Sequence, residues 1–176
     1  MTTSTVLNTI LSRKQQEVQY LRRQIPLKSL QEKIASQPSP INFSGALWGD
    51  SVRLIAEVKK ASPSRGLLRK NFDPVELATT YANSGAAAIS VLTEVDHFQG
   101  SLEHLKSVKD ATRLNNIPVL RKDFIFDPYQ IYEARAHGAD AVLLIVAALT
   151  PTQLGELLDV CRLIWLQCLV EIHDEA

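Results

Sequence analysis

Short apolar runs alternate with helical patterns along most of this sequence, and this alternation constrains the fold more than any other feature. The runs are rich in Ile, Val and Leu, and each is too short to form a buried helix. Repeated strand–helix units are typical of a parallel sheet with right-handed crossover connections. We therefore expect an α/β fold whose strands lie within residues 54–59, 86–92, 117–122, 140–146 and 164–172.

The segments between these runs carry repeated signals for the start and end of a helix. Three begin with Asp or Thr followed by Pro, at positions 73–74, 127–128 and 150–151. The first residue can cap the helix, and proline fits its first turn. Two segments end with Gly85 or Gly138 just before the next strand, where a helix C-terminus favours glycine. These signals support the same order of strands and helices.

The first fifty residues follow a different pattern. Apolar residues recur every three or four positions between Ser4 and Gln24, which predicts an amphipathic helix that Pro26 ends. A second helix is expected over residues 27–35, followed by a proline-rich connector. We therefore divide the chain into an N-terminal helical extension, residues 1–50, and a sheet-forming domain, residues 51–176. We interpret the basic residues of the first helix as a solvated face rather than a binding patch.

The composition limits the classes of function. A chain of 176 residues with 45% hydrophobic content can build one core but not two large domains. Because 19 basic residues balance 19 acidic ones, neither nucleic acid nor an anionic membrane is an expected partner, whereas a small anionic substrate remains possible. The sequence shows no export signal and no apolar run of roughly 20 residues. We expect a soluble, cytoplasmic protein.

The cysteines and histidines do not suggest a metal site. Cys161 and Cys168 lack the C-x-x-C spacing of metal ligands, and we interpret them as reduced, buried thiols. The four histidines show no ligand spacing, so we expect them to be structural or exposed.

The first predicted strand carries charges where an interior strand is normally apolar. Alternate side chains of a strand point to the same side, so Ile55, Glu57 and Lys59 share one face. A buried charge without a partner costs on the order of several kcal/mol. Glu57 and Lys59 therefore need a function or, as the alternative, form a structural ion pair.

The positions of three charged residues favour a barrel over an open nucleotide-binding sheet. The turn after the first strand lacks the G-x-G-x-x-G pattern of such sheets. In (β/α)₈ TIM barrels, catalytic groups lie at the carboxyl ends of the strands. Lys59, Lys122 and Glu171 end the first, third and fifth predicted strands, and side-chain parity directs all three into one interior. We therefore expect a (β/α)₈ barrel with its site at this end.

Four segments then point to one enzyme family: IAEVKKASPSRG at 55–66, ISVLTEVDHFQGS at 89–101, VLRKDFIFDPYQIYEARAHGAD at 119–140 and LVEI at 169–172. In this order and spacing they resemble the indole-3-glycerol phosphate synthase family of tryptophan biosynthesis. The resemblance covers the whole chain and implies a carboxy-lyase that needs no cofactor. The implied reaction closes a ring and removes carbon dioxide and water from 1-(2-carboxyphenylamino)-1-deoxyribulose 5-phosphate.

The resemblance also implies roles for the charged residues. Lys59 would hold the substrate carboxylate, Lys122 would act as general acid, and Glu171 would act as general base. Glu57 would support Lys59 and the second proton transfer, and the division of labour between the two lysines stays open. These residue types suit the chemistry, because ring closure needs an acid at a carbonyl and loss of water needs both an acid and a base.

The expected substrate-binding residues are mostly apolar. Phe98, Phe124, Leu143 and Ile145 match the family's pocket for the anthranilate ring, a flat group that such side chains can sandwich. Without the resemblance, the two phenylalanines would be interpreted as ordinary core residues. Ser62 is placed with the substrate-binding residues through a role of its hydroxyl in anion binding, and its alternative is an ordinary turn residue.

The number of strands bears on activity. A (β/α)₈ barrel has eight strands and takes roughly 250 residues. This sequence has 176 residues and five predicted strands. By resemblance, the remaining strands would supply an asparagine, a serine and the glycine-rich turns that bind the phosphate. We expect this chain to be a fragment that ends after the fifth strand, and to be inactive and prone to aggregate if made alone.

Two other functions stay open. A lysine on a barrel strand can attack a sugar-phosphate carbonyl, as in a Schiff-base lyase of the aldolase type. Alternatively, the chain is a non-catalytic barrel remnant that binds a tryptophan-pathway enzyme. A fusion to such an enzyme is also compatible with the sequence.

Overall fold

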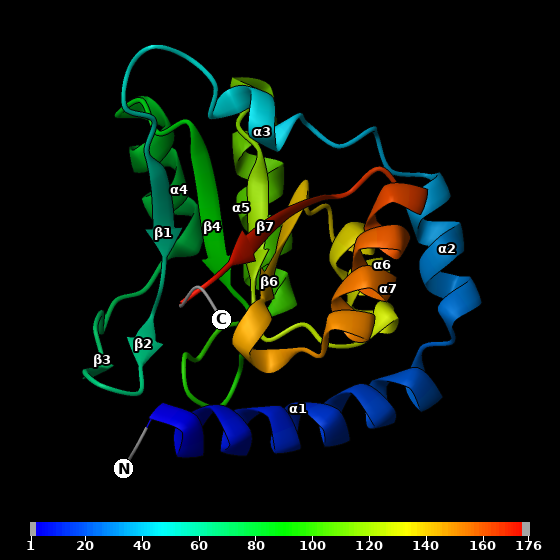
Figure 1. Cartoon of the computed structure of the whole chain (residues 1–176). Coiled ribbons are helices and arrows are strands. Elements are labelled where there is room, and N and C mark those ends of the chain that lie inside the picture. Colours follow the sequence, from blue (N-terminus) through cyan, green and yellow to red (C-terminus); the bar gives the residue numbers. More distant parts are fainter. Residues whose placement is uncertain (1–2, 174–176) are drawn as a thin grey trace.

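A computed structural model describes residues 3–173, with side chains from residue 6 onward. Its main feature is a five-stranded parallel sheet in the order β1-β4-β5-β6-β7 (Figure 1). Each new strand joins the sheet beside the preceding one, as in a barrel. The predicted runs are confirmed as β1 (Ile55–Val58), β4 (Ala88–Leu92), β5 (Val119–Lys122), β6 (Ala141–Ile145) and β7 (Gln167–Glu171).

The predicted helix starts are confirmed in detail. The Asp73 carboxylate accepts hydrogen bonds from the backbone amides of Val75 and Glu76, and Asp127 and Thr150 each form a capping box. Proline follows each cap at the first helical position. Its missing N–H breaks no helical hydrogen bond there, because the amides of the first turn have no partner within the helix. The helices between the strands are α4 (Pro74–Asn83), α5 (Leu102–Thr112), α6 (Pro128–Ala136) and α7 (Pro151–Leu163), with short 3-10 turns η1 (Arg113–Asn115) and η2 (Val146–Ala148).

The turns that lead from helix to strand share a residue with positive φ. Gly85 and Gly138 have φ of +85° and +89°, as their predicted positions require. Asn116 takes the same place before β5 with φ of +55°, and asparagine tolerates this region. The turn before β7 has Trp165 at φ of +60°, which no local sequence signal predicted.

The two faces of the sheet differ as the side-chain parity predicted. One face packs against the four helices and forms the main core, in which Val91 and Val142 are fully buried beneath Leu105 and Leu157. On the inner face, Phe43 from α3 (Phe43–Ala46) packs against Leu120 and its neighbours on adjacent strands. The helix α3 therefore covers the amino-terminal end of the inner face.

The N-terminal helices pack against α6 and across one end of the sheet. Val18 of α1 (Thr3–Gln24) and Leu30 of α2 (Leu27–Ala35) bury against Tyr129 and Tyr132. Figure 1 shows α1 along the end of the molecule toward which the strands point.

The interpretation of the basic side chains of α1 as a solvated face was wrong for Lys14, which is buried, while Arg13 and Arg22 are exposed but ion-paired. Lys14 is buried against Asp123, while Arg13 and Arg22 pair with Asp96 and Asp127. All three acidic partners follow the carboxyl ends of strands, because α1 lies across that end. Periodicity predicted the helix but not what it packs against.

The turn after β1 contains a small hairpin that the sequence did not predict, formed by β2 (Ala61–Ser62) and β3 (Gly66–Leu67). Within residues 3–173, strands β1 and β7 form the two edges of the main sheet. The arrangement corresponds to five consecutive strands of a (β/α)₈ barrel. No helix in this part of the chain combines the length and apolar character needed to cross a membrane.

Candidate active site

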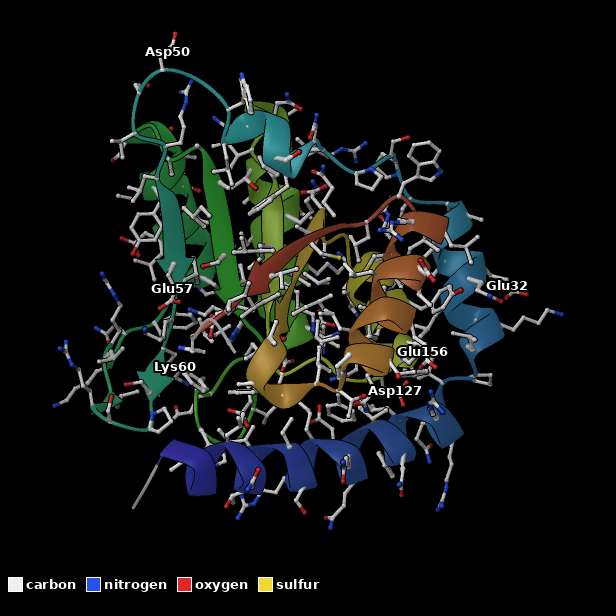
Figure 2. The ribbon with its side chains drawn as sticks, viewed as in Figure 1. Glu32, Asp50, Glu57, Lys60, Asp127 and Glu156 are labelled. Atoms are coloured by element: carbon white, nitrogen blue, oxygen red, sulfur yellow. The ribbon has the colours of Figure 1, made fainter. Side chains whose placement is uncertain are left out.

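Three of the predicted catalytic residues meet at the carboxyl end of the sheet. Glu57 lies on the inner face of β1, Lys59 follows that strand, and Lys122 ends β5. Lys122 Nζ donates to Glu57 Oε2 at 2.5 Å, and Lys59 Nζ pairs with Glu57 Oε1. Figure 2 shows Glu57 at the end of β1 where the hairpin begins. One carboxylate is thus shared by two lysines from different strands.

The charges and exposure of this group suit an anionic ligand. Burial raises the pKa of Glu57, but hydrogen bonds from Lys122 and Lys59 outweigh it and hold the pKa below its usual value. Side-chain exposures of 26% for Glu57, 32% for Lys59 and 37% for Lys122 leave the three groups open to solvent. Two ammonium groups share one carboxylate, so a net positive charge faces the inside of the sheet.

The two predicted pocket phenylalanines lie beside each other. The ring centroids of Phe98 and Phe124 are 6.3 Å apart with planes tilted by 43°, a favourable aromatic arrangement. Both rings are half-buried, and Phe124 is two residues beyond Lys122. An aromatic contact therefore adjoins the charged group along the chain.

The loop that carries Phe98 is organised by Glu94, a residue that the sequence reasoning did not single out. Its buried carboxylate accepts hydrogen bonds from the backbone amides of Asp96, His97 and Phe98, at 3.1, 2.7 and 3.0 Å. His97 Nδ1 also lies 3.2 Å from it, so this histidine has a structural contact. The sequence signal that could have identified Glu94 is its position as an acidic residue directly before a short polar loop.

The remaining predicted residues are more dispersed. Leu143 is buried on the inner face of β6, and Ile145 lies farther along the same face. Glu171 Oε1 lies 2.8 Å from His173 Nε2. The contact described for Glu171 is therefore with His173 and not with the predicted catalytic residues Lys122 or Glu57. Ser62 Oγ accepts a hydrogen bond from the Arg65 amide at 3.3 Å and so stabilises its own turn.

A second charged group lies behind β5, on the helix-facing side. Arg121 donates to Glu133 Oε2 at 2.9 Å, to Asp123 Oδ2 at 3.0 Å and to Thr93 Oγ1 at 3.1 Å. Burial raises the pKa of Asp123, but the charges of Arg121 and Lys14 and hydrogen bonds from Thr93 and Phe124 lower it below its usual value. The side chains of Arg121, Asp123 and Glu133 are 2%, 0% and 4% exposed, so this group is closed to solvent.

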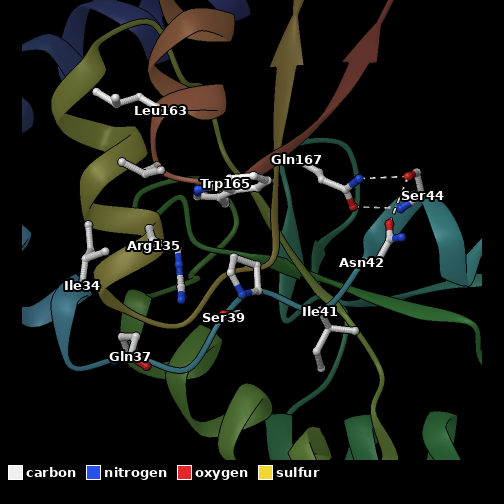
Figure 3. Close-up of a pocket in the computed structure, with 12 residues that line it drawn as sticks. Ile34, Gln37, Ser39, Ile41, Asn42, Ser44, Arg135, Leu163, Trp165 and Gln167 are labelled. Atoms are coloured by element: carbon white, nitrogen blue, oxygen red, sulfur yellow. Dashed lines mark hydrogen bonds between the residues drawn. The ribbon is translucent and has the colours of Figure 1, made fainter.

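A separate cavity lies at the opposite end of the strands. It has a volume of about 840 Å³ and lies between the α2–α3 connector, α6 and the turn before β7 (Figure 3). Two of its lining residues, Gln167 and Ser44, are joined by two hydrogen bonds of 3.0 and 2.9 Å. Trp165 and Arg135 also line it. None of the predicted site residues lines this cavity. Among residues 3–173, no cluster of three or more His, Cys, Asp or Glu side chains is arranged to hold a metal ion.

Comparison with known proteins matches almost the whole chain to one enzyme family. The family model for indole-3-glycerol phosphate synthase matches residues 7–176. The indole-3-glycerol phosphate synthase of Dehalococcoides mccartyi strain CBDB1 is 50% identical over 172 residues, which is 97% of this chain and 66% of that protein. The enzyme of the same name from Roseiflexus sp. strain RS-1 is 51% identical over 175 residues, or 97% of this chain and 65% of that protein. The chain thus spans slightly less than two thirds of the length of these relatives.

Proposed function

The chain belongs to the indole-3-glycerol phosphate synthase family, and on this premise we propose that the whole protein converts 1-(2-carboxyphenylamino)-1-deoxyribulose 5-phosphate to indole-3-glycerol phosphate. By the whole protein we mean a polypeptide that contains this chain and has the length of its relatives. The observation that carries the proposal is Glu57 held between Lys59 and Lys122 at the carboxyl end of a parallel sheet. We also propose that residues 1–50 form the extension and residues 51–176 the barrel part.

In the proposed first step, the aromatic carbon attacks the ribulose carbonyl. The carbonyl oxygen gains negative charge as the ring closes, so a nearby ammonium group stabilises it and supplies a proton. We assign Lys122 to this role and Lys59 to the substrate carboxylate. Glu57 contacts both amines and keeps them at the same place on the inner face.

The later steps need a proton donor and a base. Loss of carbon dioxide restores the conjugated ring, and loss of water needs an acid at the hydroxyl and a base at a ring proton. We assign the base to Glu171 and an assisting role to Glu57. In residues 3–173, Glu171 lies on the exposed edge strand, and its approach to the lysines requires the sheet to curve as a closed barrel does.

The substrate is proposed to bind by its flat ring and its anionic groups. The half-buried rings of Phe98 and Phe124, with Leu143 and Ile145, would contact the anthranilate ring. Ser62 would contribute a hydroxyl group near the charged residues. We place the whole protein in the cytoplasm, with a tryptophan-pathway enzyme as a possible partner or fusion.

The test is product formation by the purified whole protein, followed through the fluorescence of indole-3-glycerol phosphate. The 176-residue chain made alone serves as the comparison and is expected to be inactive, because its described sheet is open at β1 and β7. Absence of product from the folded whole protein would contradict the proposal.

Borohydride trapping distinguishes the aldolase-type alternative. Acid catalysis by Lys122 leaves no covalent adduct, whereas a Schiff base on Lys59 or Lys122 is reduced to a stable one. A trapped adduct that maps to either lysine would favour the alternative. The ion pairs of both lysines with Glu57 favour the acid–base role, since a Schiff-base lysine reacts as a neutral amine.

A further inference from the structure

The helix α1 is ion-paired to the two loops that carry the aromatic pair. Arg13 Nη1 lies 3.3 Å from Asp96 Oδ2, in the loop of Phe98. The next residue of the helix, Lys14, places Nζ 3.2 Å from Asp123 Oδ2, beside Phe124. Neighbouring residues of one helix thus contact the loop after β4 and the segment after β5.

The two ion pairs differ greatly in burial. Arg13 and Asp96 have side chains 61% and 47% exposed, so solvent screens their pair and it contributes little to stability. The side chains of Lys14 and Asp123 are 3% and 0% exposed. Lys14 Nζ also lies 3.0 Å from Oε2 of the half-buried Glu17 on its own helix. Because water cannot replace a lost partner inside the protein, removing Lys14 leaves the buried Asp123 carboxylate with less compensation, from Arg121 alone among its described cationic partners. Lys14 is therefore the stronger link between α1 and the sheet.

Asp123 connects this link to two residues of the site. It is flanked in the chain by Lys122, which points to the inner face, and Phe124, whose ring contacts Phe98. Its Oδ1 accepts the Phe124 backbone amide at 2.9 Å, and its Oδ2 accepts Thr93 Oγ1 at 2.6 Å. The carboxylate thus holds the backbone on which both neighbouring side chains depend.

We propose that Lys14 is a positioning residue of the active site. Its ion pair with Asp123 keeps segment 122–124 in place, and thereby orients the Lys122 ammonium group and the Phe124 ring. The extension is then a working part of the site, although Lys14 touches no substrate. The catalytic side of this inference rests on the proposed function.

The main variant is Lys14→Met in the whole protein, which keeps an unbranched side chain of nearly the same length and removes its charge. Lys14→Arg tests whether a cation suffices, and Arg13→Met is the matched control on the exposed pair. We expect Lys14→Met to lower kcat because the Lys122 ammonium group is misplaced. We also expect it to raise KM because the Phe124 ring is misplaced. The combined loss in kcat/KM should be about 10- to 100-fold, the scale of a misplacement near 1 Å.

The controls separate positioning from simple stability. Kinetics are measured at a temperature where circular dichroism shows each variant to be fully folded, so a purely structural role leaves kcat and KM unchanged. We expect Lys14→Arg to restore most of the activity, and Arg13→Met to stay within about twofold of the parent, as for an exposed pair. Parent values of kcat and KM in folded Lys14→Met would overturn the proposal.

A readout without turnover separates this inference from the proposed function. Hydrogen exchange at the Phe124 amide should accelerate in Lys14→Met and stay at the parent rate in Arg13→Met, because Asp123 holds that amide. If the parent protein makes no product, the proposed function fails, and hydrogen exchange alone decides whether Lys14 positions the segment. Unchanged exchange at Phe124 would overturn it.

If Lys14→Met does not fold, the double variant Lys14→Met/Asp123→Asn replaces it. This change removes both charges and leaves Arg121 paired with Glu133. We expect a folded protein with the same kinetic defect and faster exchange at Phe124. Parent kinetics in the double variant would overturn the positioning role.

Discussion

Two charged groups lie on opposite sides of β5, only one residue apart. Arg121 and Asp123 face the helices, where Lys14 and Glu133 complete a buried network of two positive and two negative charges, and the partly exposed Glu17 also pairs with Lys14. Lys122 faces inward, where Glu57 and Lys59 complete a group of two positive charges and one negative. The first group is balanced and buried, whereas the second is unbalanced and partly exposed.

This difference separates a structural role from a functional one. In the helix-facing network, each charge meets its opposite within the protein, so the network can add stability but cannot bind a ligand. In the inner group, one positive charge has no protein counterpart among the three residues, and solvent reaches all of them. A substrate carboxylate can complete that group. Changes on the two sides of one strand should therefore affect different properties.

The largest expected effect comes from Arg121→Met. The change leaves Glu133 and Asp123 buried with reduced compensation, and should lower the free energy of unfolding by about 3–5 kcal/mol. Urea denaturation of the whole protein measures this loss. The comparison would fail if Lys122→Met, one residue away but on the open side, destabilised the protein as much.

Lys122→Met should have the opposite profile. If Lys122 is the general acid, its removal lowers kcat by about 10²–10⁴-fold. Glu57 keeps its contact with Lys59, so the free energy of unfolding should change by less than about 1 kcal/mol. Steady-state kinetics and urea denaturation of the same preparation test both parts. Full activity in this variant would remove Lys122 from the catalytic residues.

Lys59→Met should mainly affect binding. A hydrogen bond to a charged group contributes about 1.5–3 kcal/mol, so loss of the carboxylate contact should raise KM about 10- to 150-fold. The value of kcat should change less than in Lys122→Met. A larger fall in kcat than in the Lys122 variant would exchange the proposed roles of the two lysines.

The smallest expected effect is on stability at acid pH. Since the pKa of Glu57 in the folded state is below its usual 4.5, the ionised group stabilises the fold above that pH and loses this contribution as the pH falls through the folded value. At pH 6, Glu57→Gln should unfold at a lower urea concentration than the parent. The two midpoints should converge as the pH falls below the folded-state pKa of Glu57, and a constant difference would show that Glu57 is not linked to folding.

Much of the fold was predictable because its signals are local. Asp127 and Thr150, each followed by proline, correctly predicted where two helices begin. All five predicted strands are confirmed. Parity correctly separated Lys122 from Arg121, because alternate residues of a strand point to opposite sides. Trp165 was not predicted at positive φ, since the local signal for that position is glycine or asparagine.

The site was only partly predictable. The sequence placed Glu57, Lys59 and Lys122 at one end of the sheet, and the structure brings them into contact. It did not reveal the amide-binding role of Glu94 or the burial of Lys14. Lys14 is separated from Asp123 by more than a hundred residues, and no local pattern specifies such a partner. The roles of all these residues in catalysis stay predictions.

The sequence by itself determined the order of the elements and the face to which each strand residue points, because both follow from local periodicity and turn chemistry. It also carried the motifs of one enzyme family. Only the tertiary structure decided which charges neutralise each other and which remain open to a ligand. Charge pairing depends on how α1, the strands and the loops pack at long range. That packing buries Lys14 and leaves Lys122 partly exposed on the inner face.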